Sequence, residues 1–146
     1  MKSIFVGLLL WTCIGSQVRA QTCAPTAVKA IRASSHPKHE RLVFEFYGQS
    51  VPEIVSLAYA KPPFIGPSGE PEKVSGKFFI EAFWHTPMED CNVIKKQPNL
   101  TVLRSVLAYD VFEGDIRYII SLNKKVAYSI MKLTNPGRLV IDFAKK

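Results

Sequence analysis

A two-residue alternation of apolar and polar side chains runs through most of the chain and limits its possible folds more than any other feature. In residues 41–47, Leu42, Phe44 and Phe46 fall on one face of an extended chain. The same spacing recurs in residues 116–122. Successive side chains of a β-strand point to opposite faces, so this period predicts half-buried strands. No window shows a helical stripe of apolar residues longer than two turns, and we therefore expect an all-β fold.

Turn-forming residues separate the strand-like segments. Proline-containing turns are expected at residues 36–39 and 135–137, and a glycine-containing turn at residues 113–115. Residues 61–73 are too rich in proline to form a central strand or helix, so we expect a surface loop there, and residues 90–99 form a second polar loop. About eight strands remain, and they span residues 28–34, 41–47, 53–59, 74–84, 101–111, 116–122, 126–133 and 138–143.

Two of these segments resemble each other. Residues 41–46 read RLVFEF and residues 138–143 read RLVIDF, and each follows a His-Pro or Asn-Pro turn by a few residues. In both, the arginine and the acid lie on one face of the strand. Either any two amphipathic strands look alike, or the pair occupies equivalent positions in two similar sheets. In both cases we expect the apolar face to be buried, namely Leu42, Phe44, Phe46, Leu139, Ile141 and Phe143.

The N-terminal segment is typical of a secretory signal peptide. Residues 4–14 form an apolar run of 11 residues, well short of the roughly 20 needed to span a bilayer. Val18 and Ala20 place small side chains before a cleavage site. We therefore expect residues 1–20 to be removed, which leaves one domain, residues 21–146, exported to the periplasm or the extracellular space without a transmembrane segment. An uncleaved membrane anchor is the alternative.

Removal of residues 1–20 leaves an even pair of cysteines, Cys23 and Cys91. Disulfides persist in exported proteins because the compartment is oxidising. We therefore expect these two residues to form a disulfide that closes a loop of about 70 residues. A bridged Cys91 cannot act as a nucleophile, and nothing around it resembles a cysteine-protease signature.

The chain is also basic. It carries 19 Lys and Arg against 12 Asp and Glu, a formal charge of +7. Loss of Lys2 and Arg19 with the signal peptide leaves 17 cationic and 12 anionic groups, a formal +5. Such an excess favours an acidic partner such as a cell wall, an anionic polysaccharide or lipid headgroups, although it can also serve solubility alone. The export signal argues against nucleic acid.

No catalytic or cofactor-binding motif stands out. The sequence has no P-loop, no G-x-S-x-G and no H-E-x-x-H. His36 and His39 flank a proline, but no further cluster completes a metal site. The carboxylate pairs lie in loops without the apolar surroundings that raise a carboxyl pKa. We expect a protein that is not an enzyme and that has no cofactor and no metal.

The order of the motifs resembles the AMIN and AMIN-like domains of bacterial envelope proteins over about residues 27–144. The matching motifs are AIR at 30–32, HP at 36–37, RLVFEF at 41–46 and PGRLVIDF at 136–143, and the AMIN-like branch in particular is suggested by PSGEP at 67–71 and FEG at 112–114. The resemblance implies a β-sandwich-like fold of two related sheets. It also implies a non-catalytic role in envelope localisation or peptidoglycan binding.

The leading hypothesis is a secreted binding module that contacts peptidoglycan or another anionic envelope polymer. Arginine presents a fixed fork of donors that suits carboxylates and phosphates, and exposed lysine pairs add charge. For two of the arginines, a cross-strand ion pair with Glu45 or Asp142 is the alternative role. The candidate binding residues are Arg41, Arg117, Arg138, Lys124 and Lys125.

Two further hypotheses belong to other functional classes. A small lipid- or ligand-carrying β protein would have a large apolar pocket between its sheets. A protein-interaction module would offer an unpaired, proline-free outer strand to an envelope protein.

Overall fold

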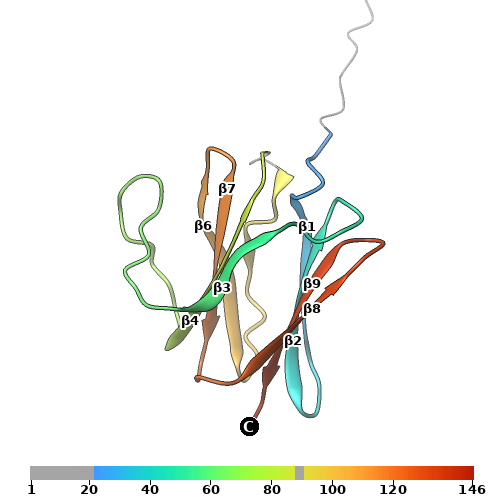
Figure 1. The fold of residues 1–146 in the computed structure, drawn as a ribbon. Coiled ribbons are helices and arrows are strands. Elements are labelled where there is room, and N and C mark those ends of the chain that lie inside the picture. The colour runs from blue at the N-terminus through green and yellow to red at the C-terminus, as the bar shows by residue number, and fades with distance from the viewer. Residues whose placement is uncertain (1–21, 88–90) are drawn as a thin grey trace, which may run out of the picture.

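The computed structural model describes residues 22–87 and 91–146, which form nine β-strands and no α-helix (Figure 1). The predicted all-β class is therefore confirmed. No helix in the described part of the chain is long and apolar enough to cross a membrane. The predicted signal peptide, residues 1–20, lies outside the described residues. The strands are β1 Val28–Ser35, β2 His39–Phe46, β3 Ile54–Ala60, β4 Phe78–His85, β5 Lys95–Lys96, β6 Leu103–Phe112, β7 Asp115–Leu122, β8 Tyr128–Leu133 and β9 Arg138–Ala144.

The strands form two antiparallel sheets. The first sheet has the order β1-β2-β9-β8, and the second has the order β3-β4-β7-β6-β5. The chain crosses to the second sheet after β2 and returns to the first after β7. Figure 1 shows the outer strands β3 and β8 on the same side of the molecule, and the Tyr128 hydroxyl joins them by donating to the Leu57 carbonyl at 3.1 Å. The predicted arrangement of two sheets is confirmed.

The two RLV segments are neighbours in one sheet, where β2 pairs with β9. Arg41 lies opposite Asp142, and Phe44 lies opposite Leu139. The hypothesis that they occupy equivalent places in two sheets is therefore wrong. In this register the apolar faces of both strands point to the same side of the first sheet, so the two strands share a sequence pattern because they share one core.

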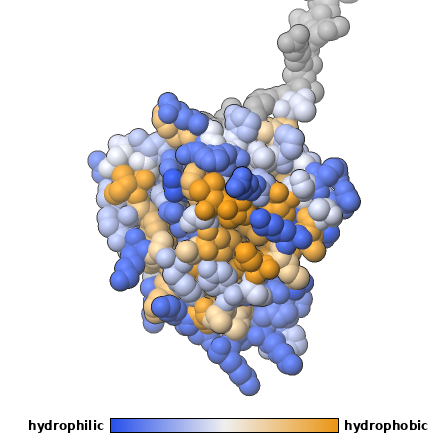
Figure 2. Space-filling model, in the orientation of Figure 1, coloured by the Kyte–Doolittle hydropathy of each residue, from blue (hydrophilic) through white to orange (hydrophobic). Residues whose placement is uncertain are grey.

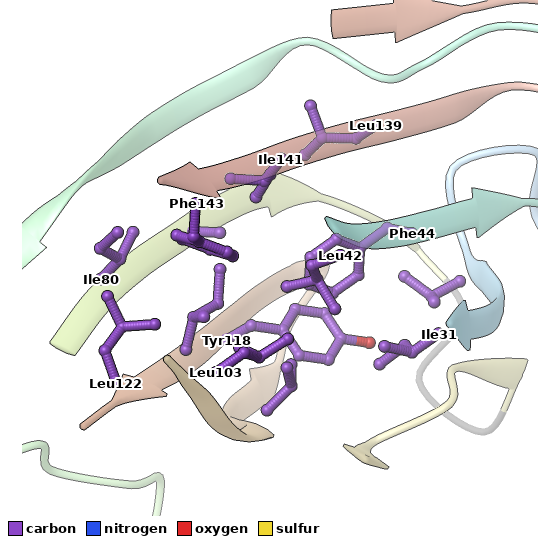
Figure 3. Close-up of a cluster of buried hydrophobic side chains, with 14 of the residues drawn as sticks. Ile31, Leu42, Phe44, Ile80, Leu103, Tyr118, Leu122, Leu139, Ile141 and Phe143 are labelled. Carbon is purple, nitrogen blue, oxygen red and sulfur yellow. The ribbon is translucent and has the colours of Figure 1, made fainter. Parts of the chain in front are cut away.

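The apolar faces of the two sheets meet in a single core (Figure 3). Phe44 of the first sheet packs edge-on against Trp84 and Tyr118 of the second, with ring centroids 5.6 and 5.1 Å apart. These large side chains fill the space between the sheets. The prediction for the RLV strands is confirmed, since full burial is found for Leu42, Phe44, Phe46, Leu139, Ile141 and Phe143.

The strand layout differs from the prediction in several places. β4 begins at Phe78 rather than at residue 74, because the chain turns at Gly76 with a φ of 142°. A Cβ at Gly76 would also come within 3.1 Å of the Ser121 side chain. β5 falls in the segment predicted as a polar loop, and it forms a short strand because its backbone pairs with Val106 and Leu107 of β6.

β8 is exposed over most of its length. It begins at Tyr128 rather than at residue 126, and Ile130, which the two-residue period groups with Val126 and Tyr128, is 48% exposed. An outer strand has a neighbour on one side only, so regular alternation in the sequence does not ensure burial there.

The predicted disulfide is confirmed: Cys23 and Cys91 are bonded, with their Cα atoms 5.6 Å apart. Two hydrogen bonds continue the connection beside it. The Val28 amide donates to the Asn92 side chain at 2.8 Å, and the Val93 amide donates to the Val28 carbonyl at 2.9 Å. The bridge therefore fastens the segment before β1 to the segment that leads into β5.

Candidate ligand-binding surface

Lysines gather at one end of the sandwich, which we call the lysine end. Figure 1 places the β1–β2 turn, the β7–β8 connection and the C-terminal residues there, opposite the point where the described chain begins. Figure 2 shows mostly hydrophilic side chains at this end. The lysine end comprises seven residues that the contacts and cavities described below bring together: Lys38, Lys61, Lys77, Lys124, Lys125, Lys145 and Lys146.

Hydrogen bonds hold segments that are distant in sequence together at the lysine end. The Lys145 amide donates to the Lys38 carbonyl at 3.0 Å, and the Lys124 Nζ donates to the Lys145 carbonyl at 2.5 Å. The Lys145 Nζ donates to the Ser35 hydroxyl at 2.7 Å. The C-terminal residues therefore lie between the β1–β2 turn and the β7–β8 connection, and cations from three segments become neighbours.

Carboxylates near the lysine end are engaged elsewhere. Glu40 is fully buried, and one of its oxygens accepts hydrogen bonds from the Val102 and Leu103 amides at 2.9 and 2.7 Å. Asp142 accepts two hydrogen bonds from Arg41, each of 2.7 Å. Within residues 22–87 and 91–146, no Asp or Glu side chain forms an ion pair with a lysine of this end. The charge of the seven ammonium groups is therefore left for solvent ions or a ligand.

A cavity of about 330 Å³ opens at the lysine end, where β3 ends and β4 begins; we call it the lysine-rimmed cavity. The Lys125 Nζ lies 5.4 Å from the centre of the Tyr59 ring, within cation–π range. The Tyr59 hydroxyl is already engaged and is not available to a ligand. It donates to the Val126 carbonyl at 2.7 Å and accepts from the Val126 amide at 3.0 Å. The lining residues are Tyr59, Ala60, Lys61, Pro62, Lys77, Phe78, Phe79 and Lys125.

Two other cavities lie beside the β1–β2 turn. One of about 330 Å³ is lined by Lys38, His39 and residues of β8 and β9, among them Asp142. Another of about 510 Å³ is lined by Pro37, Lys38 and the C-terminal residues 144–146. The first is of mixed charge because Asp142 lines it together with Lys38, so the lysine-rimmed cavity suits an anion better than this cavity does.

Arg41, a predicted binding residue, forms the cross-strand ion pair that was its alternative role. Its Nε and Nη2 donate to the two oxygens of Asp142. These hydrogen bonds hold the pKa of the Asp142 carboxyl below its usual value and raise the pKa of the Arg41 guanidinium. The two donors that would form a fork around a ligand carboxylate are therefore already used, and a ligand-binding role for Arg41 stays a prediction.

Arg138, the second predicted arginine, has no carboxylate partner in the described part of the chain. Its Cα lies opposite that of Glu45, but the Glu45 carboxylate binds Arg32 at 2.6 Å and Lys29 at 3.6 Å, both from β1. The Arg32 hydrogen bond lowers the pKa of Glu45. The buried Arg138 Nε has no hydrogen-bond partner. The alternative pair with Glu45 is therefore absent, because β1 supplies cations on the other side of β2.

Arg117, the third, lies on the outer face of the second sheet within a polar cluster. Its Nε is 3.2 Å from an Asp110 oxygen, and its Nη1 is 3.4 Å from a Glu81 oxygen. Its guanidinium carbon lies 3.8 Å from the centre of the Phe83 ring. The Tyr109 hydroxyl donates a hydrogen bond to Glu81. The pKa of Tyr109 is raised, chiefly by burial of its ring and further by this hydrogen bond. Two carboxylates therefore balance Arg117, and a ligand-binding role for it also stays a prediction.

Cys91, which the sequence analysis weighed as a nucleophile, and the pair His85 and Asp115 have the following surroundings. Cys91 is in the disulfide, so its sulfur is not a thiolate. His85 and Asp115 are joined at 2.6 Å on an exposed surface, at 68% and 38% side-chain exposure, and neither lines a cavity described above. The described ranges contain no group of three or more His, Cys, Asp and Glu residues arranged to hold a metal.

The sequence reasoning missed Lys61 and Lys77, which stand 16 residues apart and away from any other lysine pair. The fold brings them to Lys125 because β3 and β4 are antiparallel neighbours, so the end of one and the start of the other share an edge. The sequence does indicate that Lys61 and Lys77 are close to each other. Both border the proline-rich insert, and the two ends of an insert between paired strands must lie close together.

Comparison with known protein families matches residues 26–145 to the AMIN-like domain. No curated protein and no solved structure gives a significant match to the chain.

Proposed function

Because the chain belongs to the AMIN-like domain family, we propose that it is a secreted, non-enzymatic binding module whose lysine end contacts peptidoglycan or another anionic polymer of the bacterial envelope. Members of this family are generally non-catalytic binding modules associated with the cell envelope. The Cys23–Cys91 disulfide agrees with an exported location, because such bonds persist in oxidising compartments.

The observation that carries the proposal is the concentration of uncompensated lysines at the lysine end. Like charges on one surface add their potentials and attract an anionic polymer over about one Debye length, roughly 8–10 Å at physiological salt. Peptidoglycan presents peptide carboxylates, and other envelope polymers present phosphates. Both are acceptors for ammonium donors, so the proposal does not depend on the arginines that are held by carboxylates.

Co-sedimentation of the exported protein with isolated cell-wall sacculi tests this proposal. Replacement of Lys124 and Lys125 by Gln removes two charges from the lysine end, and we expect binding to weaken several-fold. Replacement of Lys95 and Lys96 by Gln removes two charges from β5, at the far edge of the second sheet, and is the matched control. Equal losses in both variants would show that only net charge matters, and failure of the unmodified protein to sediment would overturn the proposal.

The carrier hypothesis is less well supported. Phe44, Trp84 and Tyr118 fill the space between the sheets, and the cavities described above open at the surface. A surface site suits a polymer that stays in solvent, whereas a carried lipid needs an apolar interior.

The edge-strand hypothesis stays as the second candidate because of β8. This strand is one of the two outer strands of its sheet, contains no proline and exposes Ile130, Met131 and Leu133 at 48%, 44% and 36%. Figure 2 shows apolar side chains gathered on the face that carries β3 and β8. An extended segment of an envelope protein could add to such an edge. A crosslinker at position 130 tests this function in the envelope. Loss of the crosslink in Met131→Lys, with sacculus binding unchanged, would favour it.

A further inference from the structure

The side chains of the lysine-rimmed cavity present donors and no free acceptor. Lys61, Lys77 and Lys125 are exposed and carry no ion pair with any described carboxylate. The Tyr59 hydroxyl is used in both directions by Val126, and the remaining side chains of the lining are apolar. A ligand must therefore bring its own acceptors, and three cations around one cavity favour a group with more than one negative charge.

The walls of the cavity add a second requirement. Phe78 is 38% exposed, and it lines the cavity together with Pro62 and the ring of Tyr59 among other apolar groups. A flat or ring-shaped apolar surface on the ligand would cover these groups, as sugar rings do when they pack on aromatic side chains. A free inorganic anion would leave them in water, so the site favours a ring that carries the charge.

The charge of the acidic group separates phosphate from carboxylate. A phosphate monoester carries about −1.5 to −2 at neutral pH, whereas a carboxylate carries a single negative charge, and the lysine ammonium binds phosphate as a point charge. No arginine lines this cavity, and Arg41 and Arg117 are held by carboxylates elsewhere. The volume of about 330 Å³ lies at the lower end of small-molecule sites, about 300–1,000 Å³, which suits one or two sugar rings.

We propose that the lysine-rimmed cavity binds a phosphorylated sugar unit of an anionic envelope glycan. Lys61, Lys77 and Lys125 contact the phosphate, while Phe78 and Pro62 pack against the ring. This inference rests on the proposed function and narrows it, because it names one cavity of the lysine end and one ligand chemistry.

Titration of the exported protein with N-acetylglucosamine 1-phosphate, followed by NMR or calorimetry, tests the proposal. We expect saturable binding, and we expect uncharged N-acetylglucosamine at the same concentrations not to bind. The combined change Lys61→Gln, Lys77→Gln and Lys125→Gln should weaken binding at least tenfold. Phe78→Ala should weaken binding of the sugar phosphate several-fold and leave the weaker binding of inorganic phosphate unchanged. Thermal unfolding of each variant checks that it remains folded.

A second triple variant separates this inference from the proposed function. Lys38→Gln, Lys145→Gln and Lys146→Gln together remove the same charge from the lysine end outside the cavity. We expect this variant to lose sacculus binding several-fold and to bind the sugar phosphate within about threefold of the unmodified protein. If both triple variants weaken sugar phosphate binding equally, or if the sugar phosphate does not bind while sacculi do, the cavity proposal is overturned and the proposed function stands.

Two other outcomes are decisive. Saturable sugar phosphate binding that depends on the cavity lysines, without any sacculus binding, would support the cavity and overturn the polymer function. Tighter binding to vesicles of phosphatidylglycerol than to the sugar phosphate, at equal phosphate concentration, would overturn the glycan assignment in favour of a membrane surface.

Discussion

At the residue scale, the position of a charged side chain in the sheet decides what it can bind. Arg41 and Asp142 are opposite each other in the β2–β9 register, and their two hydrogen bonds join the strands. Glu45 of β2 likewise joins its strand to β1, because it accepts a hydrogen bond from Arg32. Arginines that look equivalent in the sequence therefore differ: Arg41 and Arg117 form ion pairs with carboxylates, whereas Arg138 forms none in the described part of the chain.

These ion pairs predict acid sensitivity. The pKa of the Asp142 carboxyl is lowered chiefly by the hydrogen bond from Arg41, and that of Glu45 chiefly by the hydrogen bond from Arg32. A carboxyl whose pKa is lower in the folded chain stabilises it above the unfolded pKa of about 4, and that stability is lost as pH falls through the folded pKa. Denaturant unfolding between pH 7 and pH 2 should show this loss.

Substitution at Asp142 checks the cause. Asp142→Asn should lower the free energy of unfolding at pH 7 and make its decrease with falling pH smaller. Glu53→Gln changes an exposed carboxyl outside every ion pair described above and is the control. Identical pH profiles for Asp142→Asn and the unmodified protein would contradict the assignment.

Core packing gives a second prediction at this scale. Phe44 is fully buried against Trp84 and Tyr118, so Phe44→Ala should lower the free energy of unfolding by about 3–5 kcal/mol through lost burial and a cavity. Ile130→Ala, at an exposed position of β8, should cost well under 1 kcal/mol. Comparable losses at both positions would mean that the faces of the strands have been assigned incorrectly.

At the scale of elements, turns that connect different pairs of strands pack closely against each other. The β2–β3 and β8–β9 turns lie against each other, since the Gly137 amide donates to the Gly48 carbonyl at 2.9 Å. A Cβ at Gly137 would come within 2.3 Å of the Ser50 carbonyl oxygen. Glycine is therefore required in the PGRLVIDF motif for close approach of two backbones, which the sequence does not reveal.

The disulfide joins elements that no strand pairing connects directly. Replacement of both cysteines by serine, Cys23→Ser with Cys91→Ser, should lower the free energy of unfolding by about 4 kcal/mol, because a loop of about 70 residues is no longer closed in the unfolded chain. The unmodified protein unfolded in the presence of a thiol reductant should show a similar loss. A double variant as stable as the oxidised protein would contradict this account of the bridge.

At the scale of the whole molecule, charge is distributed unevenly. Seven lysines share one end of the sandwich without a paired carboxylate in the described ranges, whereas the carboxylates at Glu81, Asp110 and Asp115 lie on the second sheet with Arg117 and His85. The molecule therefore presents one strongly positive end to its surroundings, and orientation toward an anionic polymer follows from this asymmetry.

Salt dependence tests this asymmetry. Binding to sacculi should weaken between 0.1 M and 1 M salt, as the Debye length shortens from about 10 Å to about 3 Å. The Lys124→Gln and Lys125→Gln variant should bind more weakly than the unmodified protein at low salt and almost equally at high salt. Binding that ignores salt, with tolerance of these changes, would point to an apolar contact such as the exposed face of β8.

The sequence by itself determined the fold class, the buried faces of the RLV strands and the disulfide pair. Each depends on a local period or on a small count. Alternation dictates which side chains of a strand share a face, and the two cysteines that follow the expected signal peptide allow one pairing. Even the positions of most turns followed from proline and glycine, because these residues act on their own backbone.

Only the tertiary structure decided which strands are neighbours and, through them, what the charged residues do. The RLV strands pair with each other, Arg41 meets Asp142, and Lys61 and Lys77 join Lys125 around one cavity. These contacts link segments up to about a hundred residues apart, and antiparallel pairing is set by how whole apolar faces fill one core rather than by any local motif. The candidate site consists of strand ends brought to one edge, so it exists only once the sheets have formed.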